Sequence, residues 1–298
     1  MPQLKNTLFI RQINVLEDHS NANNLQIQSM GLQRKKISAL IITYNEIGYI
    51  ENCIRSVAFA DEIIVVDSYS ADGTYEYLSA HPKVKVIQHP FKNYTAQKAF
   101  TLAQANNDWV IFVDADEVVT PMLRQEIVDT VNGQKKHVAY WFRRKFMFQQ
   151  KILRFSGWQT DKNYRLFRKS KVSFSEKRIV HETLIVDGSS GVLTPKLTHF
   201  CYRNYDNYKG KMLCYGRLKA KEAILKNKRF SYALLLAKPA FRFLYNYFIR
   251  LGILDGAKGI TVCYLNALGD WERFLELKRL EQDQQRVPKL ETFAQRSN

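Results

Sequence analysis

Three acidic residues follow a short hydrophobic run and could bind a metal ion together. The stretch from Asp108 to Glu117 reads DWVIFVDADE, and its residues 109–113 are apolar and rich in β-branched side chains, as expected of a strand buried on both faces. Asp114 and Asp116 lie two positions apart, so on an extended segment both carboxylates point to one side. Mg²⁺ and Mn²⁺ prefer such hard oxygen ligands and can bridge them to phosphate oxygens. The pattern therefore predicts a metal and diphosphate site, with acids that only solvate a strand end as the alternative.

Two further predicted strands upstream also end in polar loops. Residues 37–42 (ISALII) lead into the loop 43–46 (TYNE), and residues 63–66 (IIVV) lead into the loop 67–74 (DSYSADGT). Apolar residues at helical spacing follow each loop. Repetition of strand, loop and helix predicts an α/β fold whose parallel sheet brings these loops and residues 114–117 to one carboxyl edge. Because ligands of open α/β sheets bind at that edge, we expect a binding site there.

In this order, the motifs resemble those of a known enzyme family. IITYNE, IIVVDSYSADGT and QKAFTLAQANNDWVIFVDADE look like the motifs of family 2 glycosyltransferases with the GT-A fold, and in particular the bacterial lipopolysaccharide core biosynthesis glycosyltransferases. The resemblance covers about residues 36 to 200. It implies a GT-A (Rossmann-like), mostly parallel sheet flanked by helices, a nucleotide-sugar donor, and Mg²⁺ or Mn²⁺ as cofactor.

The resemblance also implies roles for individual residues. Lys98 would contact the donor, which is an ordinary use of a cation beside a diphosphate, with a solvated helix residue as the alternative. Apart from the resemblance, the guanidinium groups of Arg165 and Arg168 are candidates for binding phosphate or an acidic acceptor, with side chains that alternate outward from a strand as the alternative. The residues expected to bind the nucleotide sugar are Thr43, Tyr44, Glu46, Asp67, Gln97, Lys98 and Asp114, and those expected to bind the metal are Asp114 and Asp116.

A general base is expected downstream of the acidic motif. Inverting members of the family often carry a Glu-Asp pair after an arginine-containing segment, but here His181 and Glu182 follow the segment 164–169 (YRLFRK). We expect Glu182 to be the base, because a carboxylate near a desolvated pocket can have its pKa raised toward the working pH. His181 is the second choice and Asp161 the third. His181 could instead be an orienting or satisfied histidine at the end of a strand.

Positive charge and apolar helical sequence are concentrated near the C-terminus. The formal net charge is +17, and residues 209–250 hold eleven Lys or Arg against the single acid Glu222, which leaves +10. The apolar stretches in this region are interrupted or too short to cross a bilayer, which requires ~20 apolar residues. Aromatic and leucine side chains mixed with basic ones favour an in-plane helix on an anionic bilayer. The alternative is a pair of core helices with a solvated basic face.

Length and composition predict three regions in the chain. At 298 residues with 46% hydrophobic content, the chain can bury one sizeable core. We expect a disordered leader at 1–35, a GT-A domain at 36–200 and a basic amphipathic helical tail at 201–298. The four cysteines have no metal-binding spacing, which is typical of reduced thiols in a cytoplasmic protein.

The predicted function is transfer of a sugar, with inversion, from a nucleoside diphosphate donor to a lipopolysaccharide-core or other envelope glycan. We expect the donor to be a UDP-sugar. The enzyme would be peripheral on the inner face of the cytoplasmic membrane. The alternative is a non-catalytic relative that binds sugar or membrane. A nucleic-acid partner is disfavoured because the sequence has no zinc spacing or recognition signature. A nicotinamide-dependent oxidoreductase is disfavoured because no G-x-G-x-x-G follows the first strand.

Overall fold

The computed structural model describes most of the chain after the predicted leader. The described ranges are residues 34–133, 137–149, 151–157, 161–174, 184–202 and 204–294, without side chains for residues 202 and 285–294. Nearly all of the predicted leader 1–35 and both His181 and Glu182 therefore lie outside the described residues.

Strands and helices alternate in the first part of the chain, as the motif pattern predicts. The elements are β1 (Ile37–Thr43), α2 (Ile47–Ser56), β2 (Glu62–Asp67), α3 (Thr74–Ser79), β3 (Val84–Gln88), α4 (Tyr94–Ala103), β4 (Trp109–Asp114), β5 (Glu117–Val118) and α5 (Pro121–Asn132).

The following part is mainly β-structure and then entirely helical. The elements are β6 (Ala139–Phe148), β7 (Lys151–Leu153), β8 (Lys162–Arg168), η1 (Lys169–Lys171), β9 (Val172–Phe174), β10 (Leu184–Val186), β11 (Ser190–Tyr202), α6 (Tyr205–Leu225), α7 (Tyr232–Leu244), η2 (Tyr245–Ile249), η3 (Gly252–Asp255) and α8 (Ala257–Ala294).

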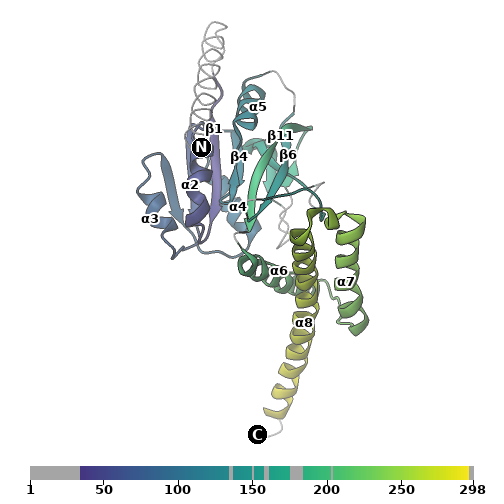
Figure 1. Ribbon diagram of the computed structural model, residues 1–298. Helices are drawn as coiled ribbons and strands as arrows, with labels where there is room; N and C mark the ends of the chain where they lie inside the picture. Colours follow the sequence, from purple (N-terminus) through teal and green to yellow (C-terminus); the bar gives the residue numbers. More distant parts are fainter. Residues whose placement is uncertain are drawn as a thin grey trace.

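A mixed sheet forms the centre of the α/β part (Figure 1). Its strand order is β3-β2-β1-β4-β8-β6-β11-β5, with β7 paired to β6. The half from β3 to β4 is parallel, whereas β8 is antiparallel to both β4 and β6. The fold is α/β, with a sheet flanked by helices and a helical C-terminal extension, as predicted. The sheet is parallel only from β3 to β4 and between β6 and β11, so it is mixed where a mostly parallel sheet was expected.

The central strands are buried on both faces, because their residues alternate between two apolar clusters. On β4, Ile111 and Val113 belong to the cluster that also contains Ile50 of α2, while Val110 and Phe112 belong to the cluster on the other face. Continuous apolar strands of this kind are typical of parallel sheets covered by helices. Packing on both faces therefore holds the ends of the strands in fixed relative positions.

The strand register brings the predicted polar loops together. Thr43 at the end of β1 pairs with Asp67 at the end of β2, and Ile42 pairs with Asp114 at the end of β4. The three loops therefore begin at the same level of the sheet, which confirms the expected carboxyl edge.

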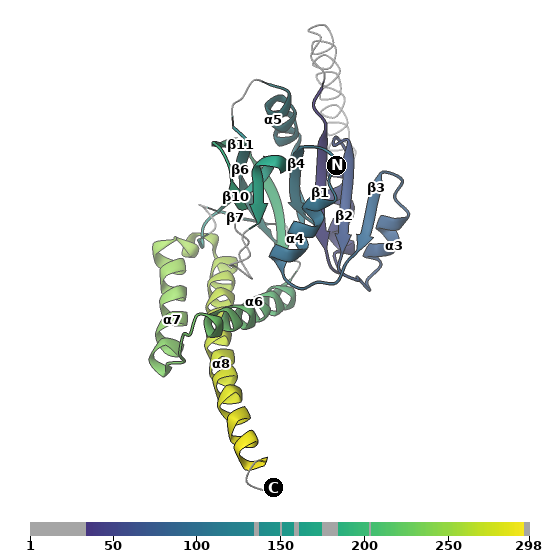
Figure 2. The same ribbon diagram turned by 180° about the vertical axis from the view of Figure 1, so that it is seen from behind.

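The helical extension is attached to the sheet through α6. Tyr208 and Met212 of α6 pack in one cluster with Phe146 and Phe148 of β6, and Tyr208 is fully buried. This packing favours the core-helix alternative for α6. In both views α6 crosses to α8, α7 lies beside α8, and α8 extends away from the sheet (Figures 1 and 2). Within the ranges given above, no helix has the length and apolar content needed to span a bilayer.

Candidate active site

Asp114, the first acid of the motif, is held by two cations at the carboxyl edge. Its carboxylate lies 2.5 Å from Nη2 of Arg165 on β8 and 3.4 Å from Nζ of Lys98 on α4. Burial raises the pKa of Asp114, but attraction to Arg165 and Lys98 outweighs burial and holds the pKa well below its usual range. The Lys98 side chain is only 7% exposed, so the alternative of a solvated helix residue is wrong.

Asp116 contacts a different pair of basic groups. Its Oδ1 lies 3.3 Å from Nε2 of His199 on β11, and its Oδ2 lies 3.5 Å from Nζ of Lys211 on α6. Burial raises the pKa of Asp116, but His199 and then Lys211 lower it more strongly, to about 2. Lys211 also lies 3.5 Å from Oε1 of Glu46. Burial lowers the pKa of Lys211, yet the two carboxylates raise it above its ordinary value, so the lysine is firmly protonated.

Glu117, the third acid of the motif, shapes the site from inside the core. Its fully buried carboxylate accepts the backbone N–H of Asp114 at 3.0 Å. It also accepts hydrogen bonds from Nη2 of Arg165 at 2.6 Å and from Nη1 of Arg144 at 3.3 Å. Burial lowers the pKa of Arg165, but Asp114 and Glu117 raise it above its ordinary value. Arg165 therefore points inward to these acids, and the expectation that it alternates outward from the strand is wrong.

Hydrogen bonds lock the loops after β1 and β2 to each other. Asn45 adopts the left-handed conformation, with φ of 55°, which asparagine tolerates better than most residues. Its N–H donates to Oγ of Ser70, and its Oδ1 accepts the N–H of Ala71, both at 2.8 Å. Fully buried Asp67 accepts the N–H and Oγ–H of Ser70 at 3.0 and 2.5 Å. These bonds show Asp67 shaping the loop; its predicted contact with a base or ribose stays a prediction.

The other predicted donor residues lie in contrasting environments. Thr43 is buried, and its hydroxyl has no hydrogen-bond partner among the described residues. Tyr44 is 60% exposed, so its ring offers a stacking surface to a bound base. Buried Gln97 donates to Oγ of Ser68 at 3.0 Å and to the carbonyl of His89 at 3.2 Å. Gln97 thus connects α4 to the loop after β2.

Known proteins similar to this chain identify its family. Residues 38–185 match the family described as glycosyl transferase family 2. An uncharacterized glycosyltransferase of Rickettsia typhi (strain ATCC VR-144 / Wilmington) is 30% identical over 261 residues, which cover 83% of this chain and 87% of the relative. The chain belongs to glycosyl transferase family 2.

Two further proteins are similar to this family 2 glycosyltransferase. The lipopolysaccharide core biosynthesis glycosyltransferase LpsC of Rhizobium meliloti (strain 1021) is 28% identical over 249 residues, which cover 80% of this chain and 92% of LpsC. The crystal structure of S. aureus TarS 1–349 in complex with UDP aligns with 83% of this chain and 92% of that chain, at 16% identity and a TM-score of 0.43.

The predicted site residues of the glycosyltransferase are not all brought into one contact network. Lys98 pairs with Asp114, and Lys211 lies between Glu46 and Asp116. Asp161, the third choice for the base, is held by Nε of Arg144 at 2.6 Å. The first two choices for the base lie outside the described residues, so their roles stay predictions.

Two residues that contact the acidic motif had no signal in the sequence. His199 and Lys211 follow Asp116 by more than eighty positions in the numbering, and the fold alone brings them to it. Lys211 is placed by α6, whose first turn is capped by the Asn204 side chain accepting the N–H of Asn207 at 2.8 Å. Such an N-cap predicts where the helix begins, but it does not reveal what the helix contacts.

Proposed function

We propose that this glycosyltransferase transfers a hexose or related sugar from a uridine diphosphate sugar to a hydroxyl of a lipopolysaccharide-core or other envelope glycan, with inversion. The observation that carries the proposal is the set of ion pairs that Asp114 and Asp116 make with Lys98, Arg165 and Lys211 at the carboxyl edge. A diphosphate needs such cations, and a site rich in both charges can exchange internal pairs for ligand contacts. The acceptor class is supported by the similarity to LpsC over 80% of this chain.

The residues around Asp116 fit a divalent cation with few protein ligands. A carboxylate and an imidazole converge there, with 3.3 Å between Asp116 Oδ1 and His199 Nε2. In the described part of the chain, no three or more His, Cys, Asp or Glu side chains form a group that could hold a metal by themselves. Mg²⁺ commonly keeps waters and substrate phosphates among its ligands, so few protein ligands suffice. Asp116 and His199 would hold Mg²⁺ or Mn²⁺, which would stabilise negative charge on the departing diphosphate.

The chain's own cations would position the donor. Lys98 and Arg165 are buried beside Asp114, so they face any phosphate bound there with little competition from water. Lys211 would approach the same diphosphate from α6. Inversion requires one displacement with a base on the acceptor hydroxyl. We retain Glu182 as that base and His181 as second choice, because Asp161 is already engaged by Arg144.

A panel of nucleotide sugars tests the proposal directly. Thermal unfolding would be recorded with UDP-, GDP- and ADP-sugars, each with Mn²⁺ or with EDTA. A donor at about 100 times its Kd stabilises the folded protein by roughly 2.7 kcal/mol, and we expect this for a UDP-sugar with Mn²⁺. The donor that binds would then be incubated, in radiolabelled form, with truncated lipopolysaccharide core.

The results separate the two predicted functions. Labelled product supports transfer, whereas donor binding with no product on any envelope glycan supports the non-catalytic alternative. If no nucleotide sugar raises the unfolding temperature, the assignment of the carboxyl edge as the donor site is contradicted.

Glu182→Gln should lower turnover by roughly a hundredfold or more while donor affinity is nearly kept.

A further inference from the structure

Helix α7 and the two short helical segments after it expose an unusually apolar surface. We call residues 232–254, which comprise α7, η2 and all of η3 except its last residue Asp255, the apolar arm. Within α7 only Leu235 and Pro239 are buried, against α8, while Phe241 is 63% and Ile249 of η2 is 68% exposed. A helix that is apolar on nearly all sides is normally buried in a protein core or in a membrane. Among the residues that the structure describes, much of the arm's apolar surface is therefore left uncovered.

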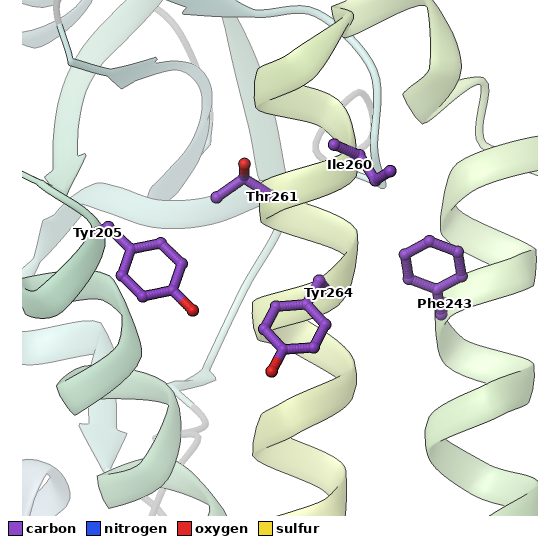
Figure 3. A pocket seen from close by; sticks show the side chains of 5 residues that line it. All are labelled: Tyr205, Phe243, Ile260, Thr261 and Tyr264. Atoms are coloured by element: carbon purple, nitrogen blue, oxygen red, sulfur yellow. The ribbon is translucent and has the colours of Figure 1, made fainter.

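The apolar surface continues from the arm onto α8 and α6. An open groove with almost no polar lining runs between the three helices (Figure 3), and it is lined by Tyr205, Phe243, Ile260, Thr261 and Tyr264. Trp271 and Leu275 follow Tyr264 at helical spacing, so they extend the same side of α8, and both are exposed. Exposed apolar residues thus occur on three neighbouring helices.

The arm and the segment just before it carry charge of one sign, although Arg242 pairs with Asp270 of α8. Residues 223–254 contain no Asp or Glu, and they contain six basic residues. Among these, Lys228, Arg229 and Lys238 are exposed. Long basic side chains beside apolar ones can bury their stems in an interface and keep their charges at a negatively charged surface.

We propose that the apolar arm docks this protein on an anionic lipid bilayer and lies in the plane of the interface. Apolar side chains would enter the boundary between head groups and acyl chains, and the basic side chains would face lipid phosphates. A second copy of the chain is a poorer partner, because a symmetric contact would bring two predominantly basic arms together. The proposal rests on the exposed surface alone and is independent of the donor chemistry.

Vesicle flotation with the full-length protein tests the docking surface. Vesicles of phosphatidylglycerol and phosphatidylcholine would be compared with pure phosphatidylcholine, without nucleotide. We expect binding to the anionic vesicles and a loss of about tenfold or more in the double variant Phe241→Ser/Ile249→Ser. Met122→Ser is the matched control, because Met122 on α5 is 73% exposed yet lies outside the arm, and this variant should bind as the wild type does.

A second measurement does not depend on substitutions in the arm. Brominated lipids quench tryptophan that enters the bilayer, so wild-type fluorescence should fall on binding, and Trp271→Phe should remove most of this quenching while retaining flotation. Three results would each overturn the proposal. They are no flotation with anionic vesicles, equal flotation of the double variant and wild type, and a dimer in sedimentation experiments that the double substitution dissociates.

Discussion

Asp114 and Asp116 are two residues apart, yet they contact different cations. Asp114 contacts Arg165 and Lys98 from β8 and α4, whereas Asp116 contacts groups from β11 and α6. Each carboxylate therefore joins different parts of the fold to the carboxyl edge. Substituting one acid should not have the same consequences as substituting the other.

Asp116→Asn tests the role of the second acid. The amide keeps the shape of the side chain but loses the charge that would bind a metal, so we expect transfer to fall by roughly a hundredfold or more. The protein should remain folded, because Lys211 keeps Glu46 as a partner. Activity and circular dichroism would be measured beside Asp187→Asn, whose acid is 82% exposed. Unchanged turnover in Asp116→Asn would contradict the assignment.

Acid titration of stability tests the environment of Asp116. Its pKa is lowered from 3.8 to about 2 in the folded protein, so the ionised form stabilises the fold above pH 4, and this stabilisation is lost as the pH falls toward 2. The contribution is roughly 2 kcal/mol at neutral pH. We expect wild type to exceed Asp116→Asn in urea stability at pH 7, with the gap narrowing below pH 4. A gap that stays constant down to pH 3 would show that Asp116 does not titrate as stated.

Two glycines of helix α6 differ in how closely other atoms approach them. A Cβ added to Gly216 would lie 2.5 Å from the carbonyl oxygen of Gly269 on α8, whereas one added to Gly210 would meet nothing within 4 Å. The two helices therefore approach so closely at Gly216 that no larger residue fits. Because the same helix carries Lys211, its position matters at the active site.

Gly216→Ala should push α6 and α8 apart and lower stability by roughly 1–3 kcal/mol. Donor affinity should fall as well, because Lys211 moves with α6. Gly210→Ala is the matched control in the same helix, and it should be neutral or stabilising by about 0.5–1 kcal/mol through helix propensity. Both quantities can be measured by urea unfolding and by nucleotide titration. Equal behaviour of the two variants would contradict the close approach.

Removing the helical extension tests whether the sheet part of the molecule can fold without it. A chain that ends at residue 207 loses Tyr208, Met212, Val262 and Leu265, which pack against β6. At about 1.5–3 kcal/mol for each buried side chain, the loss is comparable with the total stability of a typical domain, roughly 5–15 kcal/mol. We expect this chain to aggregate and not to bind nucleotide.

A chain that ends at residue 284 is the control for the truncation. It keeps α6, α7 and the described side chains of α8, so it should remain soluble and bind nucleotide. Size-exclusion chromatography distinguishes the two products. A monodisperse, nucleotide-binding product from the shorter chain would show that the sheet part folds alone.

The α/β part was predictable because its local patterns agree with its packing. Strands such as β4 are apolar throughout since both faces are buried, and their polar ends coincide with the carboxyl edge. The partners of the acids were not predictable in the same way. His199 reaches Asp116 only through the long strand β11, and Lys211 only through the packing of α6. Helix and strand periodicity does not reveal either contact, because each joins residues that are far apart in the chain.

Helix α6 contacts both the acidic motif and α8, and this has a thermodynamic consequence. Lys211 lies at Asp116, and Gly216, just over one turn further along, lies against α8. A donor that draws Lys211 away from Asp116 acts on the same rigid element that α8 holds. If donor binding changes the affinity with which α8 binds another ligand, thermodynamic linkage requires that ligand to change the affinity for the donor by the same factor. Binding at one of these two contacts of α6 would then be detectable at the other.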